Sequence, residues 1–164
     1  MKEVGPDRAC AEWLLRCGAH VRRLNSERFQ TDYNSLPAGN VASYKIEEIN
    51  ADNAAVMSVG FPYLEGLNHL KKIRFYNCVY LDDEALIELS RVKHTLEELE
   101  VGSCGVITDK GIASIAELEL LKVLKLYDLP AVRDKRGCFE ILKKALPQCD
   151  IQFPDAVPST TKST

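Results

Sequence analysis

Apolar residues recur along this chain with a period of about 25 residues, most clearly in the stretch 96–124. There Leu96, Leu99 and Val101 precede Cys104, and the alternation predicts a strand with one buried face. Aligned copies of these four positions lie on both sides, at Ile46, Ile49, Ala51 and Ala54; at Leu70, Ile73, Phe75 and Cys78; and at Leu121, Leu124, Leu126 and Leu129. The first positions, 46, 70, 96 and 121, are 24, 26 and 25 residues apart. Four copies in phase predict a repeated structural unit.

A period of about 20–29 residues with one strand and one helix per unit is typical of leucine-rich repeats. We therefore predict an α/β fold: a leucine-rich-repeat solenoid, that is, a right-handed β-α superhelix. Helices are predicted over 82–91, 109–118 and 133–145, with Asp82 and Thr108 as N-caps. A terminal strand over 148–153 is expected to close the last repeat.

The segment before the repeats has a different pattern. Trp13, Leu14, Cys17 and Val21 recur at helical spacing and predict a helix over 6–23, and a second short helix is predicted over 26–36. We expect residues 1–43 to form an N-terminal helical capping domain and residues 44–154 to form four repeats plus the terminal strand. Residues 155–164 are small and polar, which predicts a disordered tail.

The strand register also predicts which side chains face solvent. If Ile49 and Ala51 point inward, the outward residues are Glu48, Asn50 and Asp52; Lys72, Arg74 and Tyr76; Glu98, Glu100 and Gly102; Val123, Lys125 and Tyr127; and Asp150 and Gln152. Parallel neighbours lie about 4.8 Å apart, so Glu48, Lys72 and Glu98 should pair laterally, as should Arg74, Glu100 and Lys125. Two interpretations stay open: a ladder that fixes strand order and solubility, or a protein-binding surface anchored by Tyr76 and Tyr127.

Composition narrows the class of protein. The 164 residues carry a net charge of −3, which argues against a nucleic-acid partner. Six cysteines are expected to be reduced, because Cys78 and Cys104 occupy an inward repeat position. Reduced thiols fit a cytosolic or matrix compartment. No apolar run approaches the length of a membrane span.

Catalytic constellations are not apparent in the sequence, so we predict that the chain is not an enzyme, with no catalytic and no cofactor-binding residues. The histidines, His20, His69 and His94, lie in separate segments, and none of the common nucleotide, zinc-protease or hydrolase motifs occurs. Zinc at Cys78 and Cys104 is the less favoured interpretation of two packed thiols. Asn50, Asp52 and Asn53 form an oxygen-rich cluster, a weak indication of a metal.

Two segments carry a closer resemblance to a known family. The sequences Gly-Pro-Asp-Arg-Ala at 5–9 and Ala-Glu-Trp-Leu-Leu-Arg-Cys-Gly-Ala at 11–19 are similar to the N-terminal signature of mitochondrial ATP synthase subunit s, also called coupling factor B. Matching segments follow in order at 32–37, 44–46, 57–61, 65–67, 106–112 and 128–130. The resemblance covers roughly residues 4–153.

This resemblance implies a non-catalytic adaptor on the matrix side of the mitochondrial inner membrane. Its partner would be the membrane sector of ATP synthase, with peripheral membrane association and a role in proton-coupled ATP synthesis. The resemblance also implies Mg²⁺ held by backbone carbonyls, which match Gly18 and Asp52 in this sequence. The family's closely spaced thiol pair falls on Tyr76 and Cys78, so one of the two thiols is replaced.

Three alternatives remain open from the sequence. The family's relatives include a protein that assembles the membrane arm of respiratory complex I, so an assembly factor is one alternative. Cysteine-type repeats are common in F-box proteins, which makes a ubiquitin-ligase recognition module another, although residues 1–43 do not resemble an F-box. A metal-dependent enzyme, with a metal at Asp52, is the third.

Overall fold

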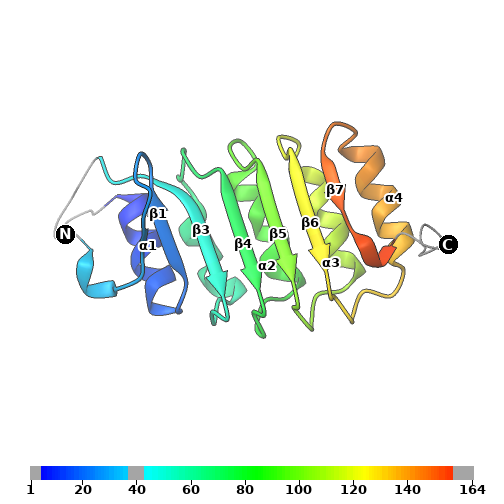
Figure 1. Cartoon of the computed structure of the whole chain (residues 1–164), viewed down its shortest axis with the longest axis horizontal. Helices are drawn as coiled ribbons and strands as arrows, with labels where there is room; N and C mark the ends of the chain where they lie inside the picture. The colour runs from blue at the N-terminus through cyan, green and yellow to red at the C-terminus, as the bar shows by residue number, and fades with distance from the viewer. Residues whose placement is uncertain (1–4, 37–42, 157–164) are drawn as a thin grey trace.

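The computed structural model describes residues 5–36 and 43–156. They form a mixed α/β protein with one seven-stranded sheet, in the order β2-β1-β3-β4-β5-β6-β7 (Figure 1). The strands are β1 (His20–Arg23), β2 (Phe29–Gln30), β3 (Ile46–Asp52), β4 (Lys72–Tyr76), β5 (Glu98–Gly102), β6 (Val123–Tyr127) and β7 (Asp150–Gln152). The helices α1 (Pro6–Arg16), α2 (Asp83–Ile87), α3 (Asp109–Ser114) and α4 (Lys135–Ala145) lie behind the sheet in the view of Figure 1.

The predicted strand register is confirmed. Strands β3 to β7 are parallel, and Ile49, Ile73, Leu99 and Leu124 are lateral neighbours in consecutive strands. All sixteen apolar residues at the aligned repeat positions are at most 4% exposed. The same four positions of each unit thus supply one continuous core between the sheet and the helices.

The helices after the strands are shorter than predicted. The predicted helix over 82–91 divides into α2 and the 3₁₀-helix η3 (Glu88–Val92), and that over 109–118 divides into α3 and η4 (Ile115–Glu117). The predicted N-caps are confirmed: Asp82 accepts from the amide of Ala85 at 3.0 Å, and Thr108 accepts from that of Lys110 at 3.3 Å. The first unit contains only a 3₁₀-helix, η2 (Ser58–Leu64), and Pro62 inside it is incompatible with a longer α-helix.

The N-terminal prediction was wrong after Arg16. Helix α1 ends there because Gly18 adopts a left-handed backbone (φ 91°). The chain then forms β1, which pairs antiparallel with β3 and buries Val21. The predicted helix over 26–36 is replaced by β2 and the 3₁₀-helix η1 (Tyr33–Ser35). The position of Val21 is compatible with the spacing of apolar residues in a helix and with that in a strand. The apolar pattern therefore did not reveal the switch from helix to strand after Arg16.

The C-terminal part also differs from the prediction. Asp155 and Ala156, assigned to a tail, belong to the 3₁₀-helix η5 (Pro154–Ala156), and Asp155 accepts from the amide of Asp128 at 3.1 Å. The rest of the predicted tail, 157–164, lies outside the described residues, as do 1–4 and the turn at 37–42. The division at residue 43 stays a prediction, because one sheet joins both parts. None of the helices in the described ranges has the length and apolarity that crossing a membrane requires.

Candidate functional site

The solvent-facing side of the sheet carries a ladder of ion pairs. Lys72 lies between Glu48 and Glu98, with Nζ 3.8 Å from a carboxylate oxygen on each side. Arg74 is held more tightly, with Nε 2.7 Å from Asp52 Oδ1 and a terminal nitrogen 2.8 Å from Glu100 Oε2. The hydrogen bond that Arg74 donates to Asp52 raises the pKa of Arg74. Most of the predicted lateral pairing is therefore confirmed, and the face largely neutralises itself.

The predicted pairing of Lys125 with Glu100 is wrong. Among the described residues Lys125 forms no ion pair, and Glu100 Oε2 instead accepts a hydrogen bond from the hydroxyl of Tyr127 at 2.5 Å. Burial and this hydrogen bond raise the pKa of Tyr127 to about 12. Glu100 can satisfy Arg74 and Tyr127 together because its carboxylate lies between their strands, whereas Lys125 extends into solvent.

Tyr76 and Tyr127 contact the protein's own network. Their ring centroids are 6.4 Å apart across Gly102 on the intervening strand. A β-carbon at Gly102 would lie 2.2 Å from the Tyr127 ring, so only glycine leaves room for this arrangement. The Arg74 guanidinium lies 5.2 Å from the centre of the Tyr76 ring. Both tyrosines are half-buried, and stabilising the sheet face accounts for most of their contacts.

The segments that contain the two residues predicted to hold Mg²⁺, Gly18 and Asp52, are in contact. The amide of Ala55 donates to the carbonyl of Cys17 at 2.8 Å, and the β-carbon position of Gly18 lies 3.9 Å from the α-carbon of Ala54. The turn after α1 thus lies beside the end of β3, where Asp52 is the last residue. The Asp52 carboxylate is committed to Arg74. Backbone carbonyls at this junction fit the hard-oxygen preference of Mg²⁺, which needs few protein ligands.

Side-chain metal ligands do not cluster in the part of the chain that the structure describes: no three His, Cys, Asp or Glu residues are placed to hold an ion. All six cysteines are free thiols, as predicted. Cys78 donates to the carbonyl of Ala51 at 2.9 Å, and Cys104 to that of Gly102 at 3.2 Å. The neighbouring thiol of Cys104, together with burial, raises the pKa of Cys78. A thiol of this kind is unreactive and behaves as core.

Asp7 is a buried charged residue that the sequence analysis did not single out. It is 2% exposed, and its Oδ2 accepts from the amide of Ile46 at 2.8 Å, while Lys45 Nζ is 4.0 Å from Oδ1. Burial raises the pKa of Asp7, and the hydrogen bond to Ile46 opposes the shift. This contact fastens the first turn of α1 to the start of β3, so its role is structural.

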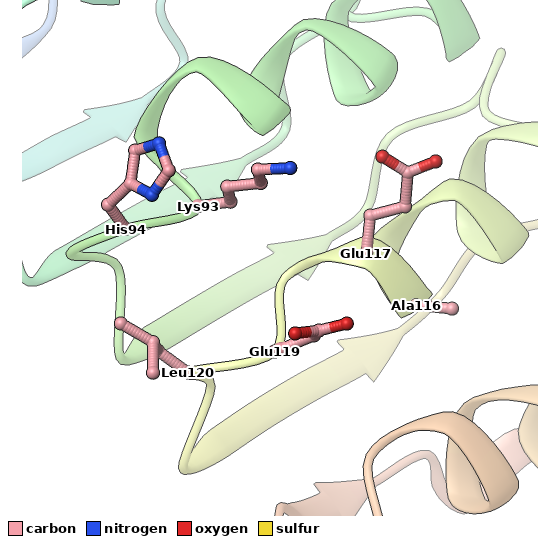
Figure 2. A pocket seen from close by; sticks show the side chains of 6 residues that line it. All are labelled: Lys93, His94, Ala116, Glu117, Glu119 and Leu120. Carbon is pink, nitrogen blue, oxygen red and sulfur yellow. The ribbon is translucent and has the colours of Figure 1, made fainter.

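A hollow of about 580 Å³ lies on the helical side between two turns. Its lining includes Lys93, His94, Glu117, Glu119 and Leu120. Figure 2 shows these side chains extending from two neighbouring segments in different directions, without converging on one point. The hollow therefore lacks the arrangement of an acid–base or nucleophilic site.

Sequence reasoning missed a set of exposed apolar side chains at the C-terminal ends of the strands. Val79, Tyr80 and Val106 are 61%, 54% and 49% exposed. A signal was available, because the four-residue segments that begin two residues after the last residue of β3, β4, β5 and β6 all lack charged residues. These segments are 54–57, 78–81, 104–107 and 129–132, and we call them the apolar edge.

The fold is that of a mixed α/β protein built of repeated strand-and-helix units. Its distinctive features are two surfaces: the ion-pair ladder on the sheet and the apolar edge. No protein-family model matches the chain. ATP synthase subunit s, mitochondrial, from Homo sapiens and from Pongo abelii are each 48% identical over 156 residues, covering 93% of this chain and 78% of theirs. Distal membrane arm assembly component 2 of Drosophila melanogaster is 29% identical over 163 residues, covering 96% of this chain and 57% of its own. The chain therefore belongs to the mitochondrial ATP synthase subunit s family.

Proposed function

We propose that this chain is a non-catalytic mitochondrial protein that associates with ATP synthase on the matrix side of the inner membrane and supports proton-coupled ATP synthesis. The observation that carries the proposal is 48% identity to ATP synthase subunit s over 93% of the chain. The self-paired ladder on the sheet face is compatible with a protein that works by contact, since it leaves no single-sign field for steering a small charged substrate.

The scaffold for this function is, in our proposal, a leucine-rich-repeat solenoid with an N-terminal cap. Its support is the parallel register of β3 to β7 and the burial of the same four positions in each unit. Units that contact only their neighbours present a long surface, which suits an adaptor.

The proposal is tested by capturing the purified, tagged chain from detergent-solubilised mitochondrial membranes and quantifying ATP synthase subunits in the eluate. We expect enrichment of the membrane sector over respiratory complexes. Recovery of no ATP synthase above the level found with an unrelated tagged protein would refute it.

A second candidate is an assembly factor for respiratory complex I. The observation that favours it is the 29% identity to distal membrane arm assembly component 2 over 96% of this chain. The same capture experiment separates the two candidates, because an assembly factor would enrich complex I membrane-arm subunits instead of ATP synthase.

We also propose that Mg²⁺ binds at the junction of α1 and β3 through the carbonyls of Gly18 and Asp52. The support is the contact between the two segments and the commitment of the Asp52 carboxylate to Arg74. A ligand that binds only the folded state raises the melting temperature, so millimolar Mg²⁺ should stabilise the protein. Asp52→Asn keeps the carbonyl and should keep this response; loss of the response would show that the carboxylate is the ligand.

A further inference from the structure

The apolar edge is a continuous feature of the fold. Its segments read Ala-Ala-Val-Met, Cys-Val-Tyr-Leu, Cys-Gly-Val-Ile and Leu-Pro-Ala-Val. In the last three, the first and fourth residues are buried and belong to the core, while the residues between them face solvent wholly or in part. The arrowheads of β3 to β6 mark this side of the molecule, along the lower edge in Figure 1.

The exposed residues of consecutive segments lie in neighbouring loops. Strands β4 and β5 are paired up to Tyr76 and Gly102, and Cys78 and Cys104 follow at equivalent positions. Tyr80 and Val106 each come two residues after these cysteines, so they occupy equivalent places in adjacent loops. Val79 beside them is the most exposed of the three. Loops that meet only water are usually polar, whereas a contiguous apolar row with a polar border marks an interaction site.

The border of the apolar edge is acidic. The two residues before and the three after each segment include seven acidic and three basic side chains, a net charge of −4. The acidic ones are Asp52, Asp82, Asp83, Glu84, Asp109, Asp128 and Asp134; the basic ones are Lys110, Arg133 and Lys135. An acidic border is repelled by anionic lipid headgroups. A second copy docked through the same edge would place two acidic borders together, so the charge favours a different protein with a basic border.

We infer that the apolar edge is the docking surface for a protein partner whose contact area is apolar at its centre and basic at its border. This inference rests on the proposed function, which makes ATP synthase the partner. Tyr80 is its central contact, because tyrosine is one of the side chains that dominate binding near the middle of a patch. Val106 in the neighbouring loop extends the exposed apolar area.

The test compares two edge variants with a matched control. Tyr80→Asp and Val106→Asp introduce a carboxylate at the edge, while Leu120→Asp introduces the same charge in a turn at the opposite end of the strands, at a site 48% exposed, against 49% for Val106. Binding of each purified variant to detergent-solubilised ATP synthase is measured by pull-down titration. Melting temperatures establish that all three variants are folded.

We expect each edge variant to bind at least about tenfold more weakly, because its unpaired carboxylate would be buried in an apolar contact, and Leu120→Asp to bind within about twofold of the wild type. High salt should weaken wild-type binding, because it screens the acidic border. If the wild type binds and both edge variants bind as Leu120→Asp does, the inference is wrong and the proposed function stands. If the wild type fails to bind, both are overturned.

Two further measurements separate the other occupants. Vesicles of phosphatidylcholine and cardiolipin are expected to show no edge-dependent binding; binding that Tyr80→Asp abolishes would make the edge a membrane surface and overturn the inference. Sedimentation velocity is expected to give the same mass for wild type and Val106→Asp. A wild-type dimer that Val106→Asp dissociates would assign the edge to self-association, which also overturns it.

Discussion

At the residue scale, four strands are each followed directly by a residue with a left-handed backbone. The φ angles of Asn53, Asn77, Ser103 and Asp128 are 58°, 55°, 52° and 51°. This conformation directs the amides of Asn53, Asn77 and Ser103 to carbonyls of the next strand, at 2.8, 3.0 and 3.1 Å. Asparagine and aspartate tolerate it better than other non-glycine residues, so Ser103 is the strained member of the set.

Ser103→Asn should therefore stabilise the protein. Its side chain can still donate to Asp128, as Ser103 Oγ does at 2.8 Å, and the backbone strain falls, so we expect a gain of about 0.5 kcal/mol. Ser103→Ala keeps the strain and loses the hydrogen bond, so it should be less stable than the wild type. The test is to compare the melting temperatures of the wild type and the two variants by thermal unfolding. An unchanged or lower melting temperature for Ser103→Asn would contradict the account.

Gly102 offers a second test at this scale, because the Tyr127 ring occupies the place of a side chain there. Gly102→Ala should displace the ring, break the Tyr127–Glu100 hydrogen bond and cost about 1–3 kcal/mol, as overpacking does. In a Tyr127→Ala background the same change should cost much less. Denaturant unfolding of the four proteins gives the coupling energy, and additive effects would show that the ring is not the obstacle.

The outward rows of the sheet could be predicted from sequence because strand residues alternate strictly. The sequence could not predict which side chains of neighbouring strands would form ion pairs or hydrogen bonds. Arg74 pairs with Asp52 as well as Glu100, and Tyr127 takes the place predicted for Lys125. Those choices depend on side-chain reach and rotamers, and on the missing side chain at Gly102, none of which is a periodic property of the chain.

At the element scale, aspartates join the helices α2 and α3 to the next unit. Asp83 at the start of α2 accepts from the amide of Thr108 at 2.8 Å and from its hydroxyl. Asp109 at the start of α3 accepts from the amides of Arg133 and Asp134 at 2.7 and 2.9 Å. These bonds satisfy backbone donors in the segment before the following helix, which have no helical partner.

Asp109→Ala should lower the free energy of unfolding by about 1 kcal/mol at pH 7, a typical cost for a lost cap. The amides of Arg133 and Asp134 lower the pKa of Asp109. The contribution is therefore complete above the unfolded-state pKa of about 3.9 and disappears as the pH falls through the lower folded-state pKa. The difference between wild type and variant, measured by urea unfolding from pH 7 to pH 3, should shrink below pH 4.

The matched control is Glu140→Ala, which removes an exposed carboxylate 3.9 Å from Arg136 on α4. An exposed pair of this kind contributes little, so its stability should follow the wild type across the pH range. A loss at Glu140 equal to that at Asp109 would point to general charge effects instead of the backbone hydrogen bonds.

The element boundaries show where sequence reasoning stops. The aligned units gave the strands and the N-caps Asp82 and Thr108 correctly because each rests on a local, repeated signal. The segment 17–36 has no copy elsewhere in the chain, and Gly18 has two interpretations, a residue within a helix or the end of one. Pairing of β1 with β3 decides between them, and that pairing is a long-range contact.

At the scale of the whole molecule, one sheet joins the N-terminal segment to the repeated units, and buried Asp7 fastens α1 to β3. The exposed face of the sheet is occupied by its own ion pairs, whereas the apolar edge has an exposed, uncharged surface with an acidic border. The apolar edge is therefore a better candidate for a protein-binding surface than the sheet face, whose charged side chains already pair with one another.

We propose that this chain works by association with ATP synthase. The most direct measurement is a native-gel migration profile of detergent-solubilised mitochondrial membranes incubated with the purified chain, resolved by mass spectrometry of gel slices. The account predicts a peak of the chain that coincides with assembled ATP synthase. A peak that coincides with complex I assembly intermediates, or migration solely as the free chain, would contradict it.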